Sequence, residues 1–511
     1  MLYALNAGTA RVAEERAAAE LGIEVAILMD RAGTALAREV ARRAPDGPIA
    51  VVAGKGNNGG DGWVAARRLA SAGRDVTVFT PVDPAAIRGP AGEAARAAAG
   101  AGVVTRVVIL EGSPAPDALR GHALVIDALF GTGFLGPVRP PFVAWIDAIG
   151  ASGAVVVAAD VPSGVDASTG TVLGCAVRAD VTVAFSAPKT GTLVYPGAEY
   201  AGEVVVADIG IPQEYLGQPG DLELWDPIDY RALLPRPAFD SHKNSRGRVL
   251  IVAGSGAFPG AAALTAMGAQ RMGAGYVAVA APESIVPVLQ AMLTSAVVMG
   301  LPESRTRTLA SKVIDAVLDV AREFDAVVLG PGMTVAHGAV HVVRALTESL
   351  DVPLVIDADG LNALIDTVGA ITVREAPTII TPHPGELARL LGVTPQTVQS
   401  DRLMYGGVLS GPRLTCVLKG ARTVVSGCGR QVITVAGGPA LATAGTGDVL
   451  AGIAGSLLAQ GLEPLEAGAL AAYLHARAGD LAAAELTALS VVAEDIPAYL
   501  PRAIRELDEE A

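Results

Sequence analysis

The sequence predicts an α/β protein of two domains, each built on a mainly parallel sheet. Short runs of β-branched residues alternate with alanine-rich helical stretches throughout the chain, which is the pattern of parallel α/β sheets. A proline-rich segment at 212–244 interrupts this alternation, as domain linkers do. The two halves carry different glycine-rich motifs, so we interpret them as two different domains and not as a duplication.

In each half, the expected strands are separated by helices, for example over 62–72. In the first half we expect strands at Ile49–Ala53, Asp75–Thr80, Ala123–Ile126, Ala154–Ala159, Val181–Phe185 and Glu203–Ile209. In the second half we expect them at Val249–Ala253, Tyr276–Ala280, Ala326–Gly330, Pro353–Asp357, Thr378–Thr381 and Thr415–Lys419. We therefore place the first domain at 1–215, a linker at 216–236 and the second domain at 237–511.

Composition excludes several classes of protein. Of the 511 residues, 51% are hydrophobic and 18% charged, which provides ample core. The net charge of −14 argues against a nucleic-acid or acidic-membrane surface. No uninterrupted apolar stretch reaches the roughly 18 residues of a membrane span. The start resembles no signal peptide, and the cysteines, Cys175, Cys416 and Cys428, are too scattered for a disulfide framework. We expect a cytoplasmic protein.

Three loops of the first half directly follow expected strands: GKGNNGGDG at 54–62, DALFGTGFLGP at 127–137 and DVPSGVD at 160–166. In a doubly wound sheet, ligands bind outside the carboxyl ends of the strands. We therefore expect the three loops to converge on one pocket.

The first loop also fits the dinucleotide-binding pattern G-x-G-x-x-G, which would suit a dehydrogenase. That function fits less well, because Asp61 would stand where a pyrophosphate lies and like charges repel. Asn58, Asp127 and Ser163 offer hard oxygen ligands that suit a group-1 or group-2 cation. Alternatively, these three side chains cap turns and a helix.

These motifs, NNGGDG, DALFGTG and D-x-PSG-x-D, resemble the NAD(P)HX epimerase family over about residues 1–215. The resemblance implies a Rossmann-like domain that interconverts the two C6 epimers of hydrated NAD(P)H, with potassium at Asn58, Asp127 and Ser163. Asp160 is the candidate acid–base group, although a carboxylate at a strand end can also be a cap. The implied substrate contacts are Asn57, Asn58, Gly59, Gly60, Asp61, Gly131, Thr132, Gly133, Phe134, Leu135, Gly136, Pro137 and Asp160.

In the second half, ATAGTGDVLAGIAG at 442–455 leads from glycines into an apolar helix. Backbone N–H groups and the helix dipole at such a start attract an anion. Asp448 in the first turn can accept a proton from a hydroxyl that attacks a phosphoryl group, or it is only an N-terminal cap. Lys419 at a strand end suits a nucleotide phosphate, or it is an exposed hairpin lysine. His383 between two prolines is a candidate to bind a phosphate or a ring edge.

The second-half motifs GPGM, DADGLNAL, TPHPGE, KGART and AGTGD resemble the NAD(P)HX dehydratases of the ribokinase-like fold over about residues 225–505. The resemblance implies phosphorylation of the C6 hydroxyl by ADP and loss of phosphate to restore NAD(P)H. Magnesium is expected to shield the nucleotide phosphates. The implied substrate contacts are Ala261, Gly332, His383 and Asp448. The implied nucleotide contacts are Lys419, Gly420, Ala421, Arg422, Thr423 and Gly447.

We thus predict a bifunctional repair enzyme that acts on NADHX and NADPHX with ADP, as a homo-oligomer. A ribokinase-like small-molecule kinase fused to a dinucleotide-binding module is the alternative, and it would release a stable phosphorylated product. The first half could instead be a non-enzymatic sensor or scaffold. Loss of epimer exchange on changing Asp160, with ligand binding intact, would count against that third possibility.

Overall fold

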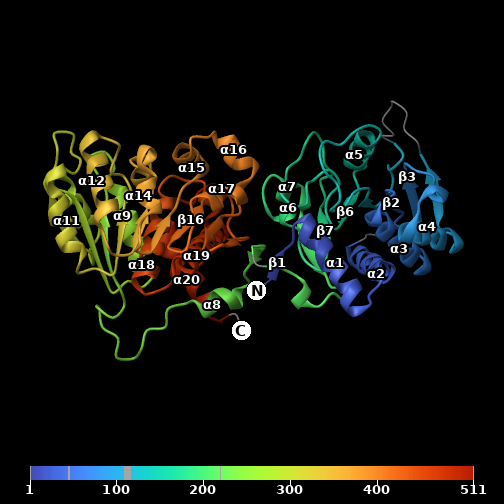
Figure 1. Cartoon of the computed structure of the whole chain (residues 1–511), viewed down its shortest axis with the longest axis horizontal. Coiled ribbons are helices and arrows are strands. Elements are labelled where there is room, and N and C mark those ends of the chain that lie inside the picture. The colour runs from blue at the N-terminus through green and yellow to red at the C-terminus, as the bar shows by residue number, and fades with distance from the viewer. Residues whose placement is uncertain (1, 44–45, 109–116, 219, 510–511) are drawn as a thin grey trace. The chain divides into compact units, whose positions relative to one another are not determined.

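A computed structural model describes residues 2–43, 46–108, 117–218 and 220–509 (Figure 1). The chain forms two compact units, Leu2–Leu222 and Glu223–Ala511. This division falls inside the segment 216–236 that we expected to be a linker. Two α/β units with parallel sheets confirm the predicted fold class. None of the helices in the described ranges is long and apolar enough to cross a membrane.

The first unit contains a parallel sheet in the order β4-β3-β2-β5-β6-β7-β8. Its strands are β1 (Leu2–Ala4), β2 (Ile49–Ala53), β3 (Val76–Thr80), β4 (Val104–Val107), β5 (Leu124–Ala128), β6 (Val155–Ala159), β7 (Val181–Phe185) and β8 (Glu203–Ala207). Its helices are α1 (Ala7–Leu21), α2 (Val25–Arg43), α3 (Asn57–Ser71), α4 (Gly89–Gly100), α5 (Phe142–Gly150), α6 (Thr190–Leu193) and α7 (Gly197–Ala201).

The order of the strands reverses between β2 and β5, so the first unit has a topological switch point there. Ligands bind at such points in doubly wound sheets. The two strand-end loops approach closely: the Gly54 amide donates to the Ala128 carbonyl at 3.0 Å. A Cβ at Gly54 would lie 2.1 Å from the Leu129 carbonyl oxygen, so only glycine fits this position.

The second unit contains a sheet in the order β18-β17-β16-β15-β14-β13-β10-β11-β12, parallel except for the antiparallel pairs β16–β17 and β17–β18. Its strands are β10 (Arg248–Val252), β11 (Tyr276–Pro282), β12 (Val297–Leu301), β13 (Ala326–Leu329), β14 (Leu354–Ile356), β15 (Thr378–Ile380), β16 (Leu414–Leu418), β17 (Val424–Gly427) and β18 (Arg430–Ile433), with β9 (Leu222–Leu224) where the units divide.

Helices of the second unit connect these strands and cover the sheet (Figure 1). They are α8 (Pro227–Ala232), α9 (Pro259–Arg271), α10 (Val286–Met292), α11 (Ile314–Ala321), α12 (His337–Ser349), α13 (Asp359–Asn362), α14 (Gly369–Thr372), α15 (Pro384–Leu391), α16 (Pro395–Ser400), α17 (Arg402–Val408), α18 (Thr446–Ala459), α19 (Pro464–Leu486) and α20 (Asp495–Glu509).

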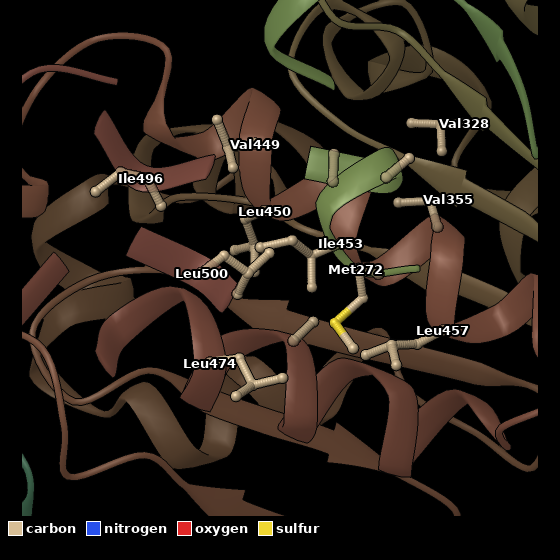
Figure 2. Packing of buried hydrophobic residues seen from close by; sticks show 14 of the residues in the cluster. Met272, Val328, Val355, Val449, Leu450, Ile453, Leu457, Leu474, Ile496 and Leu500 are labelled. Carbon is tan, nitrogen blue, oxygen red and sulfur yellow. The ribbon is translucent and has the colours of Figure 1, made fainter. Parts of the chain in front are cut away.

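Helix α18 is buried along almost its whole length, as expected of a helix that is apolar on all sides. Figure 2 shows part of the core around it, where Leu450 and Ile453 share one cluster with Leu500 of α20. Helix α9 packs directly on α18, because a Cβ at Gly452 would lie 2.0 Å from the Thr265 carbonyl oxygen. The backbone that presents Asp448 is therefore held in a tightly packed layer.

Candidate active sites

The first candidate site lies where the loops after β2, β5 and β6 meet. Asp127, the penultimate residue of β5, is fully buried. Its carboxylate accepts hydrogen bonds from the Ser163 amide at 2.8 Å and the Ser163 hydroxyl at 2.6 Å. The Ser163 Oγ accepts from the Phe130 amide at 2.9 Å, and the Asn58 Nδ2 donates to the Phe130 carbonyl at 2.6 Å. The structure thus brings together three side chains that the sequence placed on separate loops.

The donor set around Asp127 suits a hard cation. The Asn58 Oδ1 is buried and has no hydrogen-bond partner, which is costly unless something else satisfies it. Burial raises the pKa of Asp127 to about 6, although hydrogen bonds from Ser163 oppose this rise. Among the described residues, no group of three or more His, Cys, Asp or Glu side chains could hold a metal. An ion here would therefore depend on one carboxylate and neutral oxygens.

Asp160 directly follows β6 and has a left-handed backbone, with φ of 63°. Its carboxylate accepts from the Phe185 amide at 3.0 Å and from the ammonium of Lys189. Lys189 is only 3% exposed, and its ammonium also donates to the Phe185 and Ala187 carbonyls at 2.8 and 3.2 Å. Asp160 is therefore one member of a buried ion pair.

Sequence reasoning missed Lys189. The only signal was a charged residue among small and apolar ones, in FSAPKTG directly after β7. Because β7 is the next strand of the sheet after β6, its carboxyl end lies beside Asp160.

Two more carboxyls lie within electrostatic range of the ion pair. Burial, together with the negative charges of Asp160 and Glu14, raises the pKa of Asp61 well above its ordinary value. Desolvation and then the charge of Asp160 raise the pKa of Glu14 on α1. Asp61 therefore holds its proton to higher pH than an ordinary aspartate does.

The remaining predicted contacts of the first unit lie at the start of α3 and in the loop after β5. Asn57 to Asp61 form the first turns of α3, which begins at Asn57 and not at 62 as predicted. A Cβ at Gly131 would lie 3.0 Å from the Asn58 Cβ. The Phe134 ring stacks on Phe130 with centroids 4.7 Å apart. The rest of that loop is Thr132, Gly133, Leu135, Gly136 and Pro137, of which Leu135 is 74% exposed.

The second candidate site lies at the start of α18. The Thr446 hydroxyl donates to the Leu441 and Thr443 carbonyls, each at 3.0 Å. His475 of α19 lies with its Nε2 2.9 Å from the Thr446 carbonyl oxygen. Burial lowers the pKa of His475 to about 4, so the imidazole is neutral and donates this bond. The first turn of α18 is thus fixed from two sides.

A buried charge cluster faces this turn. The Lys419 Nζ lies 2.7 Å from Asp357 Oδ1 and 3.9 Å from Glu386 Oε2. Its side chain is 19% exposed, so Lys419 is not an exposed hairpin lysine. A Cβ at Gly447 would lie 3.1 Å from the Lys419 Nζ and 3.8 Å from Asp357 Oδ2. The ion pair therefore lies against the proposed anion site.

The electrostatics of this cluster suit a proton acceptor. Burial, followed by the charge of Asp357, raises the pKa of Asp448 to about 7, and Lys419 opposes the rise. Desolvation lowers the pKa of Lys419, but the charges of Asp357 and Glu386 outweigh it and leave the pKa above its ordinary value. At neutral pH the Lys419 ammonium is charged, and the Asp448 carboxyl is close to the midpoint of its titration.

His383 begins α15 as its N-cap. Its Nδ1 accepts from the Gly385 and Glu386 amides at 3.0 and 3.3 Å. Desolvation lowers the pKa of His383, against the charge of Glu386. The ring is therefore neutral, and its Nδ1 is engaged in capping. Ala261 and Gly332 also come together, because a Cβ at Gly332 would lie 2.8 Å from the Ala261 Cβ.

The predicted nucleotide-binding loop, Lys419 to Thr423, connects β16 and β17. Buried Arg402, which sequence reasoning missed, donates to the Leu418 and Lys419 carbonyls at 3.0 and 3.3 Å. Its guanidinium lies 3.0 Å from where a Cβ at Gly420 would be. Within the loop, the Thr423 hydroxyl donates to the Gly420 carbonyl at 3.2 Å. The other members are Ala421 and Arg422, and Arg422 donates to the Val435 carbonyl at 3.0 Å.

Comparison with known proteins gives concordant matches for both units. Residues 249–502 match the family model for NAD(P)H-hydrate dehydratase, and residues 25–191 match that for the YjeF-related protein N-terminus. The bifunctional NAD(P)H-hydrate repair enzyme of Moorella thermoacetica is 38% identical, over 100% of this chain and 98% of its own length. The enzyme of the same name from Thermofilum pendens is also 38% identical, over 98% of this chain and 96% of its own length.

A solved structure is similar to the second unit. It is the ADP/ATP-dependent NAD(P)H-hydrate dehydratase of Bacillus subtilis, co-crystallised with ATP and Mg²⁺. This structure is 29% identical, covers 56% of the present chain and 99% of its own, and gives a TM-score of 0.47.

Proposed function

Because the chain belongs to the family of bifunctional NAD(P)H-hydrate repair enzymes, we propose that its two units catalyse successive steps at the two sites described above. The chain is a bifunctional NAD(P)H-hydrate epimerase and dehydratase. The first unit interconverts the R and S epimers of hydrated NAD(P)H, and the second returns the S epimer to NAD(P)H. Linking the two reactions prevents the other epimer from accumulating.

We propose that dehydration uses ADP. Asp448 accepts the proton of the C6 hydroxyl as its oxygen attacks the terminal phosphoryl group, and AMP leaves. Phosphate then departs with the electrons of the C6–O bond while the ring nitrogen donates its lone pair, and a proton leaves C5 to form the double bond. A phosphate ester leaves far more readily than hydroxide, so the protein mainly positions the reactants.

The observation that carries this assignment is the position of Asp448 in the first turn of buried helix α18, beside the charged Lys419. The amides of the turn and the Lys419 ammonium favour a phosphate at this place. Magnesium, bound to the phosphate oxygens, would shield their negative charge. Ala261, Gly332 and His383 line the side on which we place the hydrated ring, and Lys419 to Thr423 with Gly447 line the nucleotide side.

The test is to incubate the protein with the S epimer of hydrated NADH, ADP and magnesium. We expect reduced nicotinamide, AMP and inorganic phosphate to appear in equal amounts. A phosphorylated dinucleotide that accumulates without phosphate release would favour the small-molecule kinase instead. Replacing ADP by ATP in a parallel reaction identifies the preferred nucleotide.

For the first unit, we propose that Asp160 and Lys189 form the acid–base pair of epimerisation. Inversion at C6 requires a bond there to break and to re-form on the other face, with a proton transferred each time. The buried ion pair supplies one acceptor and one donor in contact with each other. Asn57 to Asp61 and Gly131 to Pro137 would hold the substrate beside it.

We further propose that Asn58, Asp127 and Ser163 bind potassium. Support comes from the buried Asn58 Oδ1, which has no hydrogen-bond partner, and from the buried Asp127 carboxylate. The ion would fix the loops after β2, β5 and β6 around the substrate. Equal epimerase rates in potassium and in lithium would contradict this role. The cytoplasmic location and the homo-oligomer stay predictions.

A further inference from the structure

Asp357 is a buried carboxylate that has no role in the proposed reaction. It directly follows β14, and its side chain is only 1% exposed. Burying a carboxylate is costly unless it is paired. Its partner is the Lys419 ammonium, 2.7 Å away, which is the group we place against the nucleotide phosphates.

The pair lies at the first turn of α18. A Cβ on Gly447 would be 3.1 Å from the Lys419 Nζ and 3.8 Å from Asp357 Oδ2. Asp448 is the next residue of the same turn. The Lys419 ammonium is close to three acids, Asp357, Glu386 and Asp448. A direct ion pair with Asp448 would occupy the proton acceptor.

We propose that Asp357 is a positioning residue of the dehydratase, which holds the Lys419 ammonium on its own carboxylate and so keeps it from pairing with Asp448. This inference rests on the proposed function of the second unit. When the nucleotide binds, its phosphates add a further acceptor for the lysine, while the Asp448 carboxylate remains available for the substrate hydroxyl.

The charges that face Asp448 give the sign of the effect. Asp357, which follows β14, Asp359, the first residue of α13, and Glu386 of α15 all raise the pKa of Asp448. Lys419, which follows β16, lowers it. Replacing Asp357 by Asn removes the strongest of the three raising charges. It also frees Lys419 to approach Asp448. Both changes favour the ionised form of Asp448 at lower pH.

The experiment compares D357N with D359N in the full chain. The Asp359 carboxylate accepts from the Thr334 amide at 2.9 Å and is a weaker influence on Asp448. We measure kcat for the S epimer of hydrated NADH with ADP and magnesium between pH 5 and 9. In D357N we expect the acid limb of kcat to move down by about one pH unit or more, and the alkaline plateau to fall about tenfold because a weaker base remains. D359N should move the limb less.

A third variant, K419M, keeps the experiment decisive if D357N fails to fold. Removing the lysine deletes the charge that lowers the pKa of Asp448, so its acid limb should move to higher pH, opposite to D357N. The positioning role would be overturned if the wild type is active and the acid limb of the kcat profile lies at the same pH in D357N or in K419M as in the wild type. A wild type that does not dehydrate hydrated NADH would instead refute the proposed function.

Discussion

Asp448 should control how the dehydratase responds to pH. Burial and then the charge of Asp357 raise its pKa to about 7. Because the proton acceptor works only when ionised, activity should rise with pH through that value. The ionised fraction is about one tenth at pH 6, one half at pH 7 and nine tenths at pH 8 for a group of that pKa. The rate should therefore climb about tenfold between pH 6 and pH 8.

Asp448→Asn keeps the shape of the side chain and removes its charge. We expect kcat to fall by about 10²–10⁴-fold, the usual contribution of a positioned base, and the remaining rate to lose its acid limb. ADP should still bind, because the phosphate contacts that we propose are the backbone amides of α18 and Lys419. Asp319→Asn is the matched control, since Asp319 is an exposed acid of α11 with 72% side-chain exposure.

The assay follows the reduced-nicotinamide absorbance at saturating ADP, with ADP affinity measured by calorimetry. Full turnover in Asp448→Asn would refute the role of Asp448 as base. So would a wild-type profile that is level between pH 6 and pH 8 when product release is shown not to limit the rate. Loss of ADP affinity in the variant would indicate a binding role instead.

The other predictions concern both units. Lys189→Met should abolish exchange between the R and S epimers while the S epimer is still dehydrated; unchanged exchange would exclude the lysine as proton donor. Burial raises the pKa of Asp127 to about 6, so the contribution of this carboxyl to folding stability is lost as the pH rises through 6. We therefore expect potassium to raise the melting temperature of the first unit more at pH 8 than at pH 5. Gly452→Ala should lower the free energy of unfolding by about 1–3 kcal/mol through overpacking, in urea melts against Gly260→Ala, whose Cβ meets no atom within 4 Å. Burial lowers the pKa of His475 to about 4, so the free energy of unfolding should decrease by about 3 kcal/mol between pH 6.5 and pH 4. In urea melts, His475→Gln should lose this acid sensitivity.

The parallel core strands were predictable because they are short apolar runs bounded by polar and turn residues. Strands β2 and β7 have the bounds predicted for them. The start of α3 was predicted five residues too late, since Asn and Gly favour turns in isolation. In the fold, Asn58 to Asp61 are buried as the first turns of that helix, so tertiary packing overrides local preference. Strands β17 and β18 escaped prediction because polar residues or glycine make up half of each, as in VVSG and RQVI, so neither is a continuous apolar run.

The strand-end rule was enough to predict which loops of the first unit meet, and Asn58, Asp127 and Ser163 do lie in one hydrogen-bonded group. The strand-end rule could not identify ion-paired side chains whose contact depends on how the strands pack. Lys189 pairs with Asp160 across the ends of β6 and β7, a contact that depends on these two strands being neighbours in the sheet. Asp357 stood inside a recognised motif, but its pairing with Lys419 brings together residues 62 positions apart.

One measurement tests the assignment of both units directly: incubation of the full chain with mixed R and S epimers of hydrated NADH, ADP, magnesium and potassium. We predict complete recovery of the reduced-nicotinamide absorbance, with one AMP and one phosphate released per dinucleotide. In Lys189→Met, recovery should stop when the S epimer is consumed. No recovery, or a lasting phosphorylated dinucleotide in its place, would contradict the assignment.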